Sequence, residues 1–134
     1  MPVYDGNRFE PPAPVARVNL RHPSGGQVVE ILMLLDSGAD VTLLPRRAVE
    51  SLGVPVDNGR RYSLIGFDGT ATLSSVVRLE LIFCGRTYRG QFLLVDEEWG
   101  ILGRNVLNSI ALLLDGPRQR WDEHLPSGSK PATS

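Results

Sequence analysis

The sequence predicts an all-β domain, and three observations lead to this prediction. Runs rich in Val, Ile and Leu, some of which alternate with polar residues, are typical of half-buried strands. Short turn sequences separate these runs at the spacing of β-hairpins. Only the short segments 45–52 and 105–110 favour a helix, so helices are expected to contribute little.

The first half of the domain is expected to begin with a hairpin whose turn is Pro23-Ser24-Gly25-Gly26. Pro45 favours the start of a short helix through Leu52, because its fixed φ suits the first helical position. Gly53 is well placed to end that helix. The strands expected in this half are 15–20, 27–35 and 41–44, with a turn at 36–40.

The second half contains two further hairpin signals. Asp68-Gly69 suits a type I′ turn, which needs positive φ at both central residues. Cys84-Gly85-Arg86 separates another pair of apolar runs. Segment 105–110 has apolar residues on one side, as expected for a short helix. The strands expected here are 61–67, 70–77, 76–83, 87–95, 101–103 and 111–114.

Two polar segments flank the compact pattern, which occupies residues 15–117. Residues 1–14 contain four prolines and predict an extended N-terminal arm. Residues 118–134 end in small and polar residues and predict a flexible C-terminal tail. We therefore expect one domain between an arm and a tail.

Composition excludes several classes of function. The 134 residues are 42% hydrophobic and 22% charged, as in a soluble globular domain. The net charge of −1 gives no electrostatic reason to expect a nucleic acid or an anionic membrane as partner. Cys84 is the only cysteine, which excludes an internal disulfide and a cysteine-based zinc site. Without a signal peptide or a transmembrane stretch in the sequence, a cytoplasmic location is expected.

Asp36 is the residue that most strongly indicates chemistry. It follows an apolar run and begins a turn of small residues, and a carboxylate there is costly unless hydrogen bonds hold it. An Asp in such a turn can simply cap its own backbone. Alternatively, two carboxylates within hydrogen-bonding distance share one proton and can act as an acid–base pair. Because Asp36-Ser37-Gly38 occurs only once, the second carboxylate must then come from a second copy of the chain.

Two segments carry a resemblance to a known family. The first is Leu34-Leu35-Asp36-Ser37-Gly38-Ala39-Asp40, and the second is Ile101-Leu102-Gly103-Arg104-Asn105-Val106-Leu107. In this order, about 65 residues apart, they resemble the retropepsin family, the single-domain aspartic proteases of retroviruses and their cellular and bacterial relatives. The resemblance covers residues 15–116. It implies an all-β closed barrel with one or two short helices, active as a symmetric homodimer.

The resemblance also implies roles for residues in both segments. Asp36 would be the catalytic carboxylate, facing Asp36 of a second subunit. The rest of the active-site loop would be Ser37, Gly38 and Ala39, with the Ser37 hydroxyl locking the two loops together and the Gly38 carbonyl binding substrate backbone. Arg104 and Asn105 would support the site, and Arg104 would pair with Asp40. The alternative is that Asp40 and Arg104 are unpaired, solvated charges at the surface.

Substrate-binding residues are implied in the same way. Leu34 and Ile101 would form side-chain pockets, and Asp40 would line the cleft. A flap hairpin would close over the substrate. The flap residues would be Ile65, Gly66, Phe67, Asp68 and Gly69.

The implied activity is that of an aspartic endopeptidase, which acts on a peptide or protein substrate and needs no cofactor. No metal is expected, because Asp36 and Asp40 alone are too few ligands. Cys84 has no histidine near it in sequence, so a catalytic thiol is not expected. The alternative function is a non-catalytic retropepsin-like module that dimerises or binds peptides.

Overall fold

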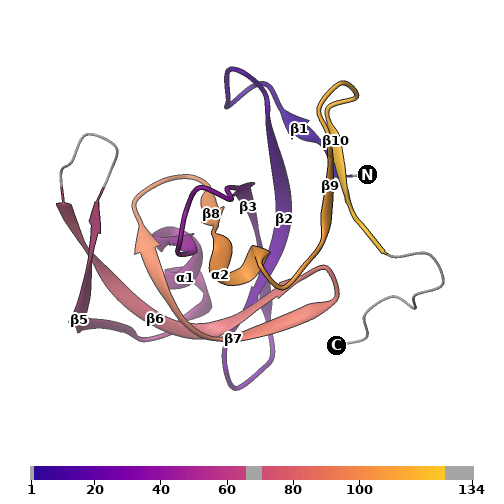
Figure 1. Cartoon of the computed structure of the whole chain (residues 1–134). Coiled ribbons are helices and arrows are strands. Elements are labelled where there is room, and N and C mark those ends of the chain that lie inside the picture. The colour runs from indigo at the N-terminus through magenta and orange to yellow at the C-terminus, as the bar shows by residue number, and fades with distance from the viewer. Residues whose placement is uncertain (1, 66–70, 126–134) are drawn as a thin grey trace.

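The computed structural model describes residues 2–65 and 71–125. Most of its elements are strands, with two short helices (Figure 1). In chain order they are β1 Tyr4–Asp5, β2 Ala13–Arg21, β3 Val28–Leu35, β4 Leu43–Pro45, α1 Arg46–Leu52, β5 Val56–Ile65, β6 Ala71–Phe83, β7 Arg86–Val95, β8 Gly100–Leu102, α2 Arg104–Leu107, β9 Leu112–Asp115 and β10 Arg120–Glu123.

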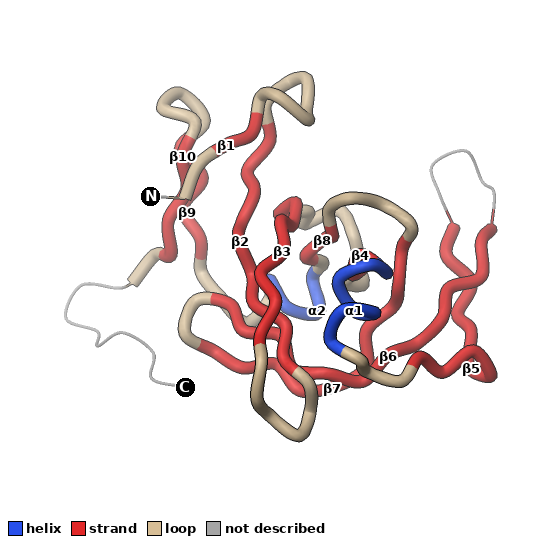
Figure 2. The backbone as a smooth tube through the Cα atoms, turned by 180° about the vertical axis from the view of Figure 1, so that it is seen from behind, coloured by secondary structure: helices blue, strands red, loops and turns tan. Residues whose placement is uncertain are grey.

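The described strands close into a barrel. The main sheet has the order β1-β2-β3-β8-β4-β7-β6-β5, and β2 also pairs with β6. This additional pairing joins β2, β3, β8, β4, β7 and β6 into a ring, which Figure 2 shows from behind. The predicted all-β closed barrel with short helices is therefore confirmed.

Alternating side chains fill the interior of the barrel. Leu20 of β2 lies opposite Leu81 of β6, and both are fully buried. Their neighbours along the strands point outward, as the period of two in a strand requires. The predicted strands occur close to their expected positions, except that β6 is one long strand where two overlapping strands were expected.

The two helices lie close to where the sequence predicts them. Pro45 precedes α1 in an extended conformation, and Gly53 ends the helix with φ of 71°. That left-handed conformation favours glycine. The α1 side chain of Val49 is fully buried in the core. Helix α2 is shorter than expected and covers residues 104–107 only. Neither helix, nor any other within the described residues, has the length and hydrophobicity needed to cross a membrane.

Strands form in both flanking segments, where the sequence predicts an arm and a flexible tail. β1 pairs with β2, and Val3 forms a bridge with Arg120 of β10 (Figure 1). β10 in turn pairs with β9 along its whole length. The expectation of a flexible tail is therefore wrong for residues 120–123. Residues 126–134 lie outside the described residues.

Trp121 explains why β10 packs against the domain. Its side chain is only 5% exposed and contacts Phe83, with 5.9 Å between the ring centroids. Its indole N–H donates to the carbonyl of Val15 at 2.7 Å. The N-terminal segment is anchored by an aromatic contact as well, because Phe9 packs edge-on against Trp99, directly before β8.

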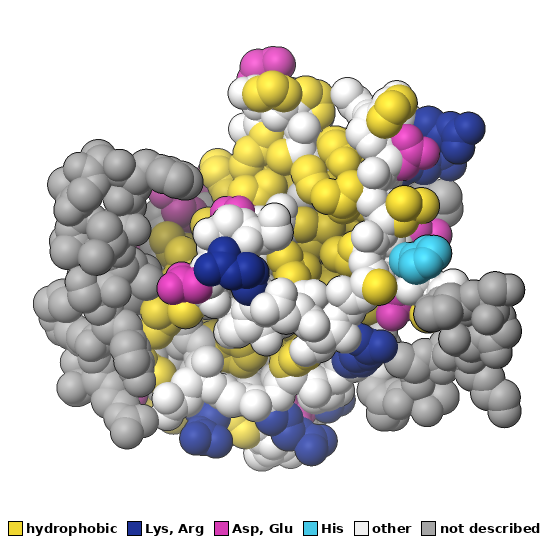
Figure 3. Space-filling model, viewed as in Figure 1, with side chains coloured by type: hydrophobic (Ala, Val, Ile, Leu, Met, Phe, Trp, Pro, Cys, Tyr) yellow, Lys and Arg dark blue, Asp and Glu magenta, His cyan; other side chains and the backbone are white. Residues whose placement is uncertain are grey.

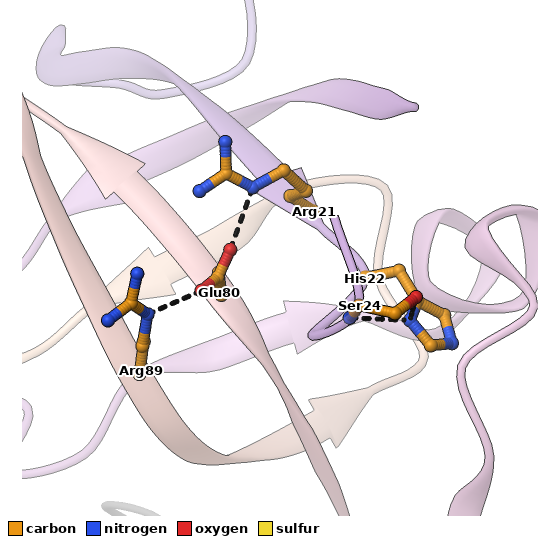
Figure 4. A network of polar contacts seen from close by, with 5 residues as sticks. All are labelled: Arg21, His22, Ser24, Glu80 and Arg89. Carbon is orange, nitrogen blue, oxygen red and sulfur yellow. Dashed lines mark hydrogen bonds and ion pairs between the residues drawn. The ribbon is translucent and has the colours of Figure 1, made fainter. Parts of the chain in front are cut away.

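A row of charged side chains links three neighbouring strands on the outer face of the barrel. Arg21 of β2 and Arg89 of β7 both lie opposite Glu80 of β6. Each arginine donates a hydrogen bond to a different oxygen of the Glu80 carboxylate (Figure 4). The hydrogen bonds from Arg89 and Arg21 hold the pKa of Glu80 below its ordinary value.

We expect Trp121→Ala to lower the free energy of unfolding by about 3–5 kcal/mol, because it removes a large buried side chain and a buried hydrogen bond. Trp121→Phe should cost less, since it keeps much of the packing. Leu113→Ala is the matched control, because Leu113 is exposed on neighbouring β9. Urea unfolding measures all three variants. A Trp121→Ala variant as stable as the Leu113→Ala variant would contradict this packing.

The lowered pKa of Glu80 predicts a pH-dependent contribution to stability. A carboxyl group whose folded pKa is depressed stabilises the fold above its unfolded pKa, and the contribution is lost as the pH falls through the folded pKa. The stability difference between wild type and Glu80→Gln should therefore be largest at neutral pH and narrow below its ordinary pKa of 4.5. Urea unfolding between neutral and acidic pH tests this. Glu30→Gln is the control, because Glu30 is in an exposed ion pair. A difference independent of pH would be inconsistent with the ion pairs.

Candidate active site

The parallel pairing of β3 with β8 brings the two sequence motifs together. Leu34 lies opposite Ile101, and Leu35 lies opposite Leu102. The backbone N–H of Asp36 then donates to the carbonyl of Leu102 at 3.1 Å. Asp36 is therefore placed at the end of β3, next to the strand that leads into α2. The two sequence motifs, about 65 residues apart in the chain, are therefore neighbours in the structure.

The loop after Asp36 is a tight turn that fixes one oxygen of the carboxylate. The N–H of Ala39 donates to the Asp36 carbonyl at 3.1 Å, and the N–H of Gly38 donates to Asp36 Oδ1 at 3.0 Å. Within the described chain, no hydrogen bond or ion pair engages Oδ2. The Asp36 side chain is half-buried, whereas Ser37 and Gly38 are exposed. The loop thus orients the carboxylate and keeps its second oxygen for another partner.

Arg104 holds this loop by hydrogen bonds to two of its backbone carbonyls. Its N–H donates to the carbonyl of Ala39, and its Nη1 donates to the carbonyl of Ser37, both at 2.8 Å. The expected ion pair between Arg104 and Asp40 does not form within the described chain, where Asp40 is exposed. The guanidinium is instead engaged by Ser37, whose carbonyl faces α2. Arg104 therefore ties the loop to the helix, although by a different partner from the predicted one.

Gly103 lets the backbone of the second motif pass very close to the chain after the Asp36 loop. A Cβ atom at this position would lie 2.2 Å from the carbonyl oxygen of Val41, a distance that real Cβ atoms do not show. Any larger residue would push β8 and α2 away from the loop. This contact gives a physical reason for the glycine in the motif.

Thr42 is a supporting residue that the sequence reasoning missed. Its side chain is 1% exposed, accepts a hydrogen bond from the N–H of Gly103 at 3.1 Å, and donates one to Asn105 Oδ1 at 2.7 Å. The hydroxyl of Thr42 thus joins the backbone of Gly103 to the side chain of Asn105. A hydroxyl within the apolar run 41–44 was the available signal, because a buried polar group normally has a partner.

The predicted substrate-binding residues lie at two places. Leu34 and Ile101 are half-buried and adjacent in the sheet beside the loop, and Leu43 also lies opposite Ile101. Ile65 ends β5 and lies opposite Ala71 at the end of the β5–β6 hairpin. The predicted flap residues Gly66, Phe67, Asp68 and Gly69 lie outside the described residues.

Other chemistry has less support in the described structure. Burial raises the pKa of the Cys84 thiol to about 11, so the thiol stays protonated at neutral pH and is a poor nucleophile. Among the described residues, no group of three or more His, Cys, Asp and Glu side chains is arranged to hold a metal ion.

Hydrophobic side chains are concentrated on the face shown in Figure 3, over the part occupied by β2 and β3.

Comparisons with known proteins agree with this geometry. Residues 18–106 match the family model described as aspartyl protease. Among solved structures, the chain resembles "EIAV protease complexed with the inhibitor HBY-793", with a TM-score of 0.56 and 23% sequence identity. The similarity covers 72% of this chain and 86% of that one, and at this identity it establishes the fold. No sequence among curated proteins matches the chain.

We expect Thr42→Val to lower the free energy of unfolding by about 1–3 kcal/mol, because it leaves the buried N–H of Gly103 without an acceptor. Thr42→Ser keeps the hydroxyl and should cost less. Urea unfolding gives the free energies. Amide hydrogen exchange at Gly103 and Arg104 reports the local effect, which should be faster in the Val variant. Equal stability and equal exchange in both variants would exclude a supporting role for this hydroxyl.

Proposed function

The chain belongs to the aspartyl protease family and has a retropepsin-like fold, and on that premise we propose that it is an aspartic endopeptidase that works as a homodimer. One observation carries the proposal. Asp36 is held at the end of β3 with Oδ1 bonded to its own loop, and the chain contains a single Asp-Ser-Gly sequence. A one-chain site would therefore have half of the acid–base pair that this chemistry needs.

In the proposed mechanism, two Asp36 carboxyl groups share one proton across the dimer axis. Like charges at this distance cannot both ionise cheaply, so the pair titrates as a unit. The ionised carboxylate takes a proton from a water molecule, whose oxygen attacks the peptide carbonyl carbon. The protonated carboxyl group gives its proton to the carbonyl oxygen, which forms a tetrahedral diol. Proton transfer to the amide nitrogen then breaks the carbon–nitrogen bond.

The loop supports this role through its rigidity and its exposure. Arg104 and Gly103 hold it against β8 and α2, so Asp36 has little freedom to turn away. Ser37 and Gly38 are exposed, which leaves the Ser37 hydroxyl and the Gly38 carbonyl free for a second loop and a substrate backbone. A preorganised carboxylate of this kind lowers the cost of assembling the reactive pair.

An extended peptide is the substrate class that we propose. Leu34 and Ile101 would offer apolar surface beside Asp36, and Asp40 would provide the polar wall of the cleft. The segment from Ile65 to Gly69 would close over the bound peptide and exclude water. Backbone hydrogen bonds to an extended substrate would then supply affinity, and the apolar side-chain pockets would supply specificity.

We expect Asp36→Asn to abolish cleavage of a fluorogenic peptide library at mildly acidic and neutral pH. It should also inhibit the wild type when subunits are allowed to exchange. In an equal mixture with random pairing, activity per wild-type chain should fall to about half, because mixed dimers have one carboxyl group. Asp96→Asn is the control, since Asp96 is exposed and forms a surface ion pair with Arg46. It should neither lose activity nor inhibit.

Two outcomes would overturn parts of this proposal. Cleavage that persists in Asp36→Asn would rule out Asp36 as the catalytic carboxylate. Full wild-type activity in the exchanged mixture would rule out a site shared between subunits. A folded wild-type protein that binds library peptides and cleaves none of them would favour the non-catalytic binding module.

A further inference from the structure

A cluster of charged side chains lies at the end of the paired strands β2 and β3 that is farther from Asp36. The ladder begins with Val15 opposite Leu34, next to Asp36, and ends with Arg21 opposite Val28. Arg21, Glu80 and Arg89 form a row across β2, β6 and β7 on the outer face of the barrel. Nothing in the proposed protease mechanism uses these residues.

The Glu80 carboxylate orients both arginines by their Nε atoms. Arg21 Nε lies 2.7 Å from Oε1, and Arg89 Nε binds Oε2 (Figure 4). The Glu80 side chain is 8% exposed, whereas that of Arg89 is 76% exposed. Among the described contacts, none uses the terminal Nη atoms of either arginine. Two guanidinium groups are thus held in place by Nε, with their terminal Nη donors still available.

A third arginine belongs to the same patch. Arg78 lies two residues before Glu80 on β6, and side chains two apart in a strand share a face. A cavity of about 260 Å³ lies beside Arg78 and Arg89, and Arg21 is joined to it through its hydrogen bond to Glu80. It is lined by Pro23, Arg78, Leu79, Glu80, Arg89 and Gly90. Arginine side chains gather along the edge of the molecule below β6 and β7 in Figure 3.

The positive charge of the three arginines is larger than the negative charge of Glu80. Three arginines and one glutamate give a local charge of +2, in a chain whose net charge is −1. One arginine would be enough to pair with a carboxylate. Guanidinium donor pairs match the oxygen spacing of phosphate and carboxylate groups. A doubly charged phosphate group balances the surplus, whereas a single carboxylate balances only half of it.

We propose that Arg21, Arg78 and Arg89 form a binding site for a phosphate group, with Glu80 as the residue that positions two of the three guanidinium groups. The phosphate group can be free or carried by a phosphorylated peptide. Because Glu80 already holds Arg21 and Arg89, these two side chains lose little conformational freedom when the ligand binds. The site goes beyond the proposed proteolysis and does not depend on it.

Titrations of the full chain at constant ionic strength test the site, with inorganic phosphate and a phosphoserine peptide as the two probes. NMR amide shifts should saturate and should be largest around residues 21, 78–80 and 89. Arg89→Ala and Arg78→Ala should each weaken binding about tenfold or more, as expected when a charged hydrogen bond is lost. Arg89→Lys, which keeps the charge without the planar fork, should fall between wild type and Arg89→Ala. Arg78 is exposed, so Arg78→Ala should keep the wild-type unfolding curve. Arg89→Ala also removes one of the two hydrogen bonds to Glu80, so it should be less stable at neutral pH, and its binding is measured under conditions in which it is folded.

Arg17→Ala is the matched control. Arg17 is an exposed arginine on β2, the strand of Arg21, and it is paired with Glu30. It should bind phosphate as the wild type does. The unphosphorylated form of the peptide should not shift the amide signals around residues 21, 78–80 and 89. Saturation by the phosphopeptide alone would assign the site to peptide-borne phosphate, and saturation by both probes would assign it to the phosphate group itself. Failure of both probes to saturate, or equal weakening by Arg17→Ala and Arg89→Ala, would overturn the proposal.

Discussion

The parallel pairing of β3 with β8 is the constraint on which the rest of the structure depends. Parallel strands need a crossover connection, so a long segment of chain must lie between them. Here that segment contains β4, α1, β5, β6 and β7, and the pairing of β6 with β2 closes the barrel. The β3–β8 pairing is thus part of the barrel wall and also places Asp36 beside Leu102. Gly103 permits it, because no side chain would fit between α2 and the carbonyl of Val41.

The candidate active site combines a rigid foundation with an exposed loop. Thr42 satisfies the buried N–H of Gly103, and Arg104 satisfies the carbonyls of Ser37 and Ala39, so the turn has few unpaired backbone groups. The parts that remain exposed are those that a second loop and a substrate would need. Such an arrangement favours a site that is preorganised within one chain and completed by another, which is the function we propose.

The two ends of the β2–β3 ladder have opposite electrostatic character. Near Asp36 the charged groups are the carboxylates of Asp36 and Asp40 and the guanidinium of Arg104, whereas near Arg21 two arginines are paired with one nearly buried glutamate and exposed Arg78 follows on the same strand face. Glu80 illustrates why a buried charge is retained only with partners, since removing it from water is costly unless hydrogen bonds compensate. Because the two ends share no contact residues, changes at one should have little effect on the other.

Sequence patterns alone predict the strand-rich class, most hairpins, helix α1 with Gly53 at its end, and the two motifs that meet at Asp36. These features are local, because alternation and turn chemistry depend on residues close together in the chain. The folded structure was needed to show that Arg104 binds the Ser37 carbonyl and not Asp40, and that Thr42 supports Gly103. It alone showed that Trp121 docks β10 on the barrel. The residues in each contact are between 61 and 106 positions apart in the sequence. Such contacts depend on the path of the chain, so no local sequence pattern predicts them.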